Sequence, residues 1–143
     1  MNSFPHIIDI IPGALLFRVS AEMDNTITRR IARFVDEMDA LQHGGILDIV
    51  PSYGSVLVIY DDTVSSGVTL QPELVAAWER TSRSPDSAPI SNVTVDVVYG
   101  DTFGEDLTNV SAFLGKPVNE VITLHVSGSY TVGAVGFSPG FTY

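Results

Sequence analysis

The chain has 143 residues and a formal net charge of −10, with a single lysine and no cysteine. The absence of cysteine excludes disulfides, thiolate catalysis and zinc-thiolate sites, and the charge argues against nucleic-acid binding, which needs clustered Lys and Arg. No apolar run reaches the roughly 18 residues of a membrane span, and the first residues lack the charged and apolar regions of a signal peptide, so we expect a cytoplasmic protein.

The first half of the chain predicts a small α+β domain. Residues 14–20 alternate as a half-buried strand does. A helix follows over residues 24–41, with Asp24 as its N-cap. Its apolar residues recur at helical spacing on one face, which we expect to be buried: Ile27, Ile31, Phe34, Val35, Met38 and Leu41. The basic cluster Arg29, Arg30 and Arg33 lies away from that face, and is either a solvated surface or a contact for a partner or anion.

Two strands and a second helix come next. Residues 46–50 and 55–60 are typical of strands joined through a turn over residues 51–54. Pro72 suits the first position of the helix, which turns Leu74, Val75 and Trp78 inward.

A polar segment then divides the chain. Residues 82–91 hold two prolines, and we expect a first domain over residues 1–84, a linker over 85–91 and a second domain over 92–143. Residues 93–99 alternate as a strand does. This strand either completes a β-α-β-β-α-β ferredoxin-like motif or opens the second domain, and the linker favours the second alternative.

The second domain is predicted to be incomplete. A short helix over residues 105–114, with Leu107, Val110 and Leu114 buried, ends at Gly115. Pro117 starts another helix that carries an apolar stripe ending at His125, and a strand covers residues 130–137. These elements bury too little surface for a whole domain, so we expect either association with a partner chain or a poorly ordered C-terminal third.

The last eight residues combine glycines, aromatics and a proline, a composition that suits a pocket wall. They contain a G-x-S-x-G pattern, but Pro139 follows the serine and has no N–H for an oxyanion hole. All three histidines also precede that serine, so we do not expect a serine hydrolase. His125 is either a helix-terminal residue that bonds a carbonyl or a polar group aimed into this pocket.

Three blocks together carry a family resemblance. They are GILDIVPSY (45–53) with SVLVIYD (55–61), VDVVYG (95–100) with FGEDL (103–107), and VITLH (121–125) with Tyr130 and GFSPGFTY (136–143). The sequence resembles the allophanate hydrolase subunit 1 family, also called the KipI family, which includes the B subunit of bacterial 5-oxoprolinase and part of urea amidolyase. The family tends to show a Gly-Asp pair before the first strand, where this chain has IPGA (11–14).

The resemblance implies a ferredoxin-like N-terminal domain followed by the beginning of a cyclophilin-like β-barrel. It implies one component of an ATP-dependent 5-oxoprolinase that works with the A and C subunits, with ATP and Mg at a site shared with a partner and none bound by this chain alone. His125 and Tyr130 would be catalytic. The substrate-binding residues would be Gly136, Phe137, Pro139, Gly140, Phe141 and Tyr143. The alternatives are an inhibitor that binds a sensor histidine kinase, and a carboxyltransferase component of a urea or allophanate system.

Overall fold

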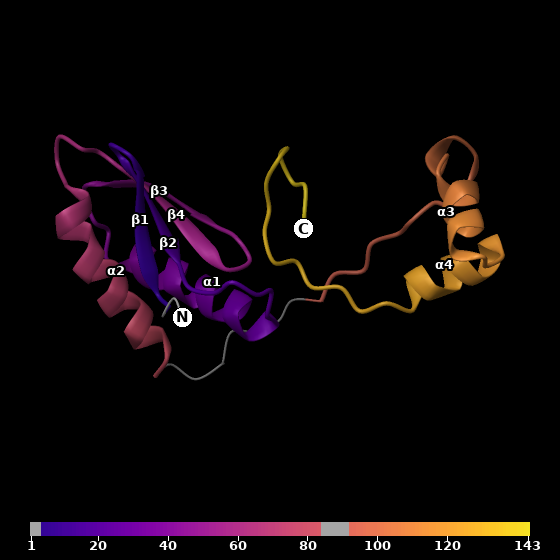
Figure 1. Cartoon of the computed structure of the whole chain (residues 1–143), viewed down its shortest axis with the longest axis horizontal. Coiled ribbons are helices and arrows are strands. Elements are labelled where there is room, and N and C mark those ends of the chain that lie inside the picture. Colours follow the sequence, from indigo (N-terminus) through magenta and orange to yellow (C-terminus); the bar gives the residue numbers. More distant parts are fainter. Residues whose placement is uncertain (1–3, 84–91) are drawn as a thin grey trace. The chain divides into compact units, whose positions relative to one another are not determined.

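A computed structural model of the protein describes residues 4–83 and 92–143. The chain forms two compact units, one of residues 1–87 with 131–143 and one of residues 88–130, and each is described by itself (Figure 1). The predicted linker over residues 85–91 lies outside the described residues.

A four-stranded antiparallel sheet organises the first unit. Its strands are β1 (His6–Ile11), β2 (Ala14–Arg18), β3 (Ile46–Pro51) and β4 (Ser55–Tyr60), in the spatial order β1-β2-β4-β3. The three predicted strands are confirmed, whereas β1 was not predicted. Residues 7–11 are four isoleucines around one aspartate, a composition without the alternation by which a half-buried strand is recognised.

Both helices of this unit begin at a side-chain cap. Helix α1 (Asn25–Ala40) starts after Asp24, whose carboxylate accepts a hydrogen bond from the backbone N–H of Thr26 at 2.5 Å, as predicted. Helix α2 (Gly67–Thr81) begins at Gly67 and not at Pro72, which lies inside it. The predicted start was wrong because the cap comes earlier. The hydroxyl of Ser66 accepts a hydrogen bond from the backbone N–H of Thr69. In return, the hydroxyl of Thr69 accepts one from the backbone N–H of Ser66.

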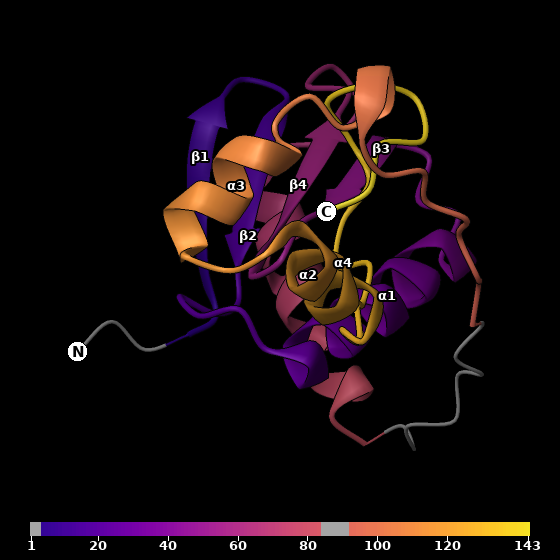
Figure 2. The ribbon, with the colours of Figure 1, turned by 90° about the vertical axis from the view of Figure 1, so that its right-hand side faces the viewer.

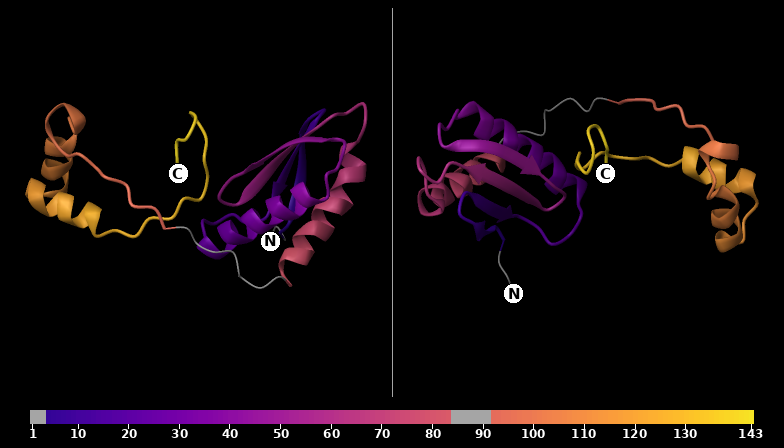
Figure 3. Two further views of the ribbon diagram at one scale, coloured as in Figure 1. Left: turned by 180° about the vertical axis from the view of Figure 1, so that it is seen from behind. Right: turned by 90° about the horizontal axis from the view of Figure 1, so that it is seen from above.

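Helices α1 and α2 cover the same face of the sheet, where the core lies (Figure 3). At its centre the rings of Phe17 and Phe34 stack with centroids 5.2 Å apart, and Trp78 meets both edge-on. The predicted inward residues of both helices lie in or against the core except Val35, which is half-buried outside it, and Leu41, which follows the last helical residue and is 49% exposed. The buried core consists of Leu15, Phe17, Val19, Ile31, Phe34, Met38, Val56, Val58, Tyr60, Leu70, Leu74, Ala77 and Trp78.

The regular structure of the second unit is helical over its described residues, 92–130. It contains the 3-10 turn η1 (Asp101–Phe103) and the helices α3 (Leu107–Leu114) and α4 (Val118–Val126), drawn in orange in Figure 2. Gly115 ends α3 with a φ of 62°, a conformation that favours glycine, as predicted. No helix in the described ranges combines the length and apolar character needed to cross a membrane.

Two predictions for this unit were wrong. Residues 92–99 form no strand, because their backbone makes no hydrogen bond to any described residue, and a strand needs a neighbour to pair with. The predicted burial of Leu107, Val110 and Leu114 also fails, since α3 has no buried residue and Val110 and Leu114 are exposed. Helical periodicity predicts an apolar face correctly, but burial requires a second surface to pack against that face.

Candidate functional site

The end of helix α4 carries the first candidate site. His125 stands in the last turn of the helix, which ends at Val126, and the chain then turns back so that Tyr130 reaches the helix terminus. The hydroxyl of Tyr130 donates to the backbone carbonyl of His125 at 2.8 Å, and the two rings lie with centroids 5.4 Å apart. The structure therefore brings together the two residues predicted to be catalytic.

Tyr99 completes this cluster and was not predicted as a site residue. Its hydroxyl forms a hydrogen bond with Nδ1 of His125, and its ring meets the imidazole edge-on at 5.7 Å between centroids. Tyr99 precedes η1 and is 26 positions away from His125 in the sequence. In the sequence Tyr99 closes an alternating segment and belongs to the VDVVYG (95–100) block, but neither pattern shows which helix the residue would meet.

The cluster of Tyr99, His125 and Tyr130 is open to solvent. Tyr130 is 70% exposed, His125 is exposed, and Tyr99 is half-buried. Imidazole and phenol groups in this arrangement can bind oxygen atoms of a ligand and transfer protons to or from it. Because the cluster is open, a ligand or a partner surface would have to exclude water from it.

The second candidate site is the C-terminal segment, where the predicted strand over residues 130–137 was wrong. Residues 133–143 instead form a narrow hairpin, drawn in yellow in Figure 1, with an isolated bridge between Val135 and Thr142. The N–H of Gly133 donates to the carbonyl of Tyr143 at 2.8 Å, and the N–H of Gly136 donates to that of Phe141 at 2.9 Å. The segment pairs with itself because Gly140, with a φ of 78°, allows the chain to reverse.

Aromatic rings line this hairpin in a chain of contacts. The Phe141 ring meets Phe137 at 5.8 Å and Tyr143 at 5.0 Å between centroids. Phe137 is 92% exposed, so the rings form a surface and not an enclosed pocket. Ser138 lies at the turn, where its N–H donates to the carbonyl of Gly136, and residues 141–143 pair back onto residues 133–136. The serine therefore lies in a hairpin and not at the strand-turn-helix junction of a hydrolase nucleophile.

The six predicted substrate-binding residues all lie in this hairpin, which belongs to the first unit. His125 and Tyr130 belong to the second. The structure thus places the two predicted catalytic residues beside each other in one unit, and the six predicted substrate-binding residues together in the hairpin.

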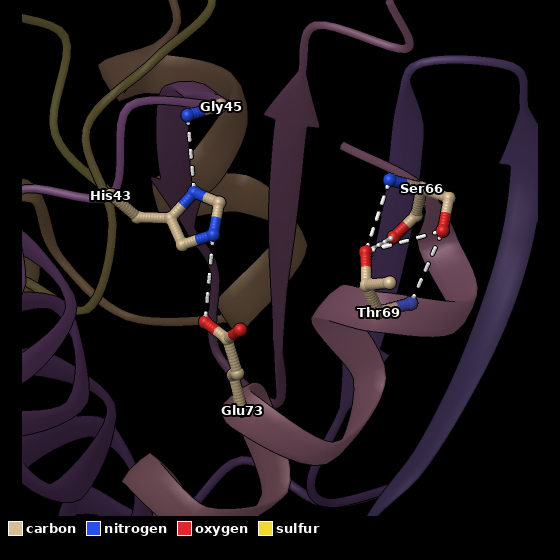
Figure 4. Close-up of polar contacts among 5 residues, drawn as sticks. All are labelled: His43, Gly45, Ser66, Thr69 and Glu73. Carbon is tan, nitrogen blue, oxygen red and sulfur yellow. Dashed lines mark hydrogen bonds and ion pairs between the residues drawn. The ribbon is translucent and has the colours of Figure 1, made fainter. Parts of the chain in front are cut away.

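His43 has a structural role in the first unit (Figure 4). Its Nδ1 accepts a hydrogen bond from the backbone N–H of Gly45 at 3.1 Å, and its Nε2 lies 3.6 Å from a carboxylate oxygen of Glu73. These contacts connect the turn after α1 to helix α2. Because the exposed Glu73 is its only charged contact among the described residues, we assign His43 to the fold.

The described part of the chain contains no group of three or more His, Asp or Glu side chains arranged to hold a metal. Lys116 forms an ion pair with Glu120, and the Asp61 carboxylate accepts hydrogen bonds from the hydroxyl and the backbone N–H of Thr63. These bonds hold the pKa of Asp61 below its usual value, and the bond from the Thr63 hydroxyl has the larger effect of the two.

Comparison with known proteins places the chain in a family. The family profile described as carboxyltransferase domain, subdomain C and D, matches residues 6–143. The B subunit of 5-oxoprolinase from Escherichia coli O157:H7 is 32% identical over 99 residues, which are 68% of this chain and 44% of that protein. The chain spans less than half the length of the curated relatives it matches.

Solved structures agree with this assignment. The structure of TTHA0988 has a TM-score of 0.69 at 28% identity, covering 90% of this chain and 24% of that one. The uncharacterized protein PH0987 from Pyrococcus horikoshii has a TM-score of 0.52 at 27% identity, covering 96% of this chain and 62% of that one. The resemblance seen in the sequence is confirmed, and the chain belongs to the carboxyltransferase subdomain C and D family that includes allophanate hydrolase subunit 1 and the 5-oxoprolinase B subunit.

Proposed function

We propose that this chain forms part of a 5-oxoprolinase subunit that acts with partner subunits to open 5-oxoproline to glutamate, coupled to ATP hydrolysis. The observation that carries the proposal is the 32% identity to a 5-oxoprolinase B subunit across 68% of this chain. A division of labour between subunits suits a chain whose candidate residues lie at the surface, because a shared site is completed by the partner.

The finer fold assignment belongs to the same proposal. The order β2-α1-β3-β4-α2 matches the first five elements of the ferredoxin-like motif, with β1 added at the edge beside β2. We assign residues 1–84 to a ferredoxin-like domain, and residues 92–143 to the first part of a cyclophilin-like barrel. The exposed apolar residues of α3 and α4 support an incomplete second domain, since such faces are buried in a finished one.

The cluster at the end of α4 supplies the proposed chemistry. Opening a cyclic amide places negative charge on the carbonyl oxygen and requires a proton on the leaving nitrogen. The imidazole of His125 and the hydroxyl of Tyr130 can donate hydrogen bonds to such an oxygen, and an imidazole can also transfer a proton to the leaving nitrogen. The C-terminal hairpin would contribute substrate contacts through Gly136, Phe137, Pro139, Gly140, Phe141 and Tyr143.

Nucleotide binding is the part of the reaction that this chain's sequence supports least, because it contains neither a G-x-x-x-x-G-K-[ST] nor a G-x-G-x-x-G phosphate-binding motif. We therefore assign nucleotide binding mainly to a partner subunit and derive no step through it here.

Glutamate release from 5-oxoproline tests the proposal. The chain is combined with candidate A and C subunits and ATP, and each component is omitted in turn. We expect glutamate only when all are present, and a loss of roughly 10²–10⁴-fold in rate with His125→Ala. Full activity without this chain would overturn the proposal.

The description of the family itself favours a second candidate, a carboxyltransferase component of a urea or allophanate system. That function requires a biotin-carrying partner and bicarbonate. Transfer of labelled carboxylate from carboxybiotin to urea, dependent on this chain, would favour it over the oxoprolinase. None of the relatives described above is named as a kinase inhibitor, so the alternative of a histidine-kinase partner gains no support.

A further inference from the structure

We propose that Tyr99 holds His125 with its proton on Nε2, so that His125 serves its ligand as a hydrogen-bond donor and not as a proton acceptor. The ligand atom would be a carbonyl or carboxylate oxygen. Identifying that oxygen as the carbonyl of a cyclic amide rests on the proposed function, whereas the tautomer itself does not.

The argument begins with the hydrogen bond between the Tyr99 hydroxyl and Nδ1 of His125. In neutral imidazole one nitrogen donates and the other accepts, and the partner of one nitrogen determines which. A phenol is a good donor to an imidazole nitrogen. When the Tyr99 hydroxyl donates to Nδ1, the proton of the neutral ring must lie on Nε2.

The opposite tautomer leaves the Tyr99 proton without an acceptor among the described residues, so that it must bond to solvent. If Nδ1 carried the proton and donated to the phenol oxygen, the Tyr99 O–H would need a second partner. No described residue other than His125 forms a hydrogen bond with that hydroxyl. If His125 becomes an imidazolium, both nitrogens carry protons and Nε2 is again a donor. Nε2 therefore carries a proton both in the neutral form in which Tyr99 donates to Nδ1 and in the imidazolium.

The remaining contacts orient this donor. Tyr130 binds the backbone carbonyl of His125 at 2.8 Å and packs beside its ring without using either ring nitrogen. Nε2 has no hydrogen-bond partner in the parts of the chain that the structure describes, and the side chain is exposed. Tyr99 is thus a positioning residue, because it acts on the ligand only through His125.

Nitrogen-15 NMR of the imidazole rings in the full 143-residue chain tests the tautomer directly. The chain has three histidines, and loss of one signal set in His125→Gln assigns His125. We expect the Nε2–H form of the neutral ring. Tyr99→Phe should shift His125 toward a mixture of tautomers. Tyr130→Phe is the matched control, because it removes a hydroxyl that does not touch the ring nitrogens.

His43 provides an internal reference in the same spectra. Its Nδ1 accepts from the N–H of Gly45, so its tautomer should be unchanged in both variants. Finding the Nδ1–H form of His125 in the wild-type chain would overturn the proposal. An unchanged tautomer ratio in a folded Tyr99→Phe, judged by unchanged backbone amide spectra, would overturn it equally.

Activity then separates this inference from the proposed function. In the reconstituted assay, His125→Gln places an amide N–H near the position of Nε2. A donor role predicts partial activity for His125→Gln and a loss of roughly 10²–10⁴-fold for His125→Ala. Equal losses in the two variants would refute the donor role. If the wild-type assay produces no glutamate, the proposed function fails, while the NMR result still decides the tautomer.

Discussion

Arg30 of helix α1 is stacked on Trp78 of helix α2. Its guanidinium carbon lies 3.7 Å from the centroid of the indole ring, and Nη2 donates to the backbone carbonyl of Trp78 at 2.7 Å. Nε donates to the hydroxyl of Thr81 at 3.0 Å. Burial, followed by the nearby charge of Arg33, lowers the pKa of Arg30 from its ordinary value. One arginine of the basic cluster is therefore used to join the two helices.

Replacing Arg30 by lysine should destabilise the protein although the charge is kept. Lysine cannot stack its planar group on the indole or bind Thr81 and Trp78 at the same time. We expect a loss of about 1–2 kcal/mol in the free energy of unfolding, measured by urea denaturation. Arg83→Lys, at an exposed position, is the control and should change stability little. Equal stability of Arg30→Lys and the wild type would show that the stacking does not contribute.

Two phenylalanines make a matched test of the core. Phe34 is fully buried against Phe17 and Trp78, whereas Phe113 in helix α3 is 90% exposed. Phe34→Ala should cost about 3–5 kcal/mol, because it removes buried apolar surface and leaves a cavity. Phe113→Ala should change the free energy of unfolding by less than about 0.5 kcal/mol. A large loss for Phe113→Ala would mean that its ring is buried in solution.

The cap of helix α2 can be tested at Ser66. Ser66→Ala removes the acceptor for the N–H of Thr69 and should cost about 1 kcal/mol in the free energy of unfolding. Ser66→Asp keeps an acceptor there and adds a negative charge at a helix N-terminus, which is favourable. Thermal unfolding should therefore rank the aspartate variant above the alanine variant, and the reverse order would contradict the assignment of this cap.

Asp24 should make the stability of helix α1 depend on pH. The backbone N–H of Thr26, followed by its hydroxyl, holds the pKa of Asp24 below its ordinary value of 3.8. Because the pKa is lower in the folded state, the stabilisation is complete above pH 3.8 and is lost as the pH falls through the folded-state value. The difference in Tm between the wild type and Asp24→Asn should shrink over that acid range. A difference that stays constant with pH would contradict the contribution of the charge.

The candidate site was predictable only in part. His125 and Tyr130 were recognisable because helical spacing and a short connection place them near one helix end, and the structure confirms that they are neighbours. The turn-forming residues of the C-terminal block could also be recognised in the sequence. The hairpin that the block forms could not be predicted, because glycine permits a chain reversal without specifying where the returning chain will bond. Tyr99 was missed because its contact with His125 is made across 26 positions of sequence.

The sequence by itself determined the features that depend on neighbouring residues. The alternation of β2, the apolar stripe of α1, its Asp24 cap and the left-handed Gly115 all follow from local sterics and hydrogen bonding, and the family follows from three ordered blocks. Only the tertiary structure decided which extended segments became strands. Residues 6–11 pair with β2, whereas residues 92–99 find no partner among the described residues. The physical reason is that a helix satisfies its own backbone, but a strand depends on a distant segment for its hydrogen bonds.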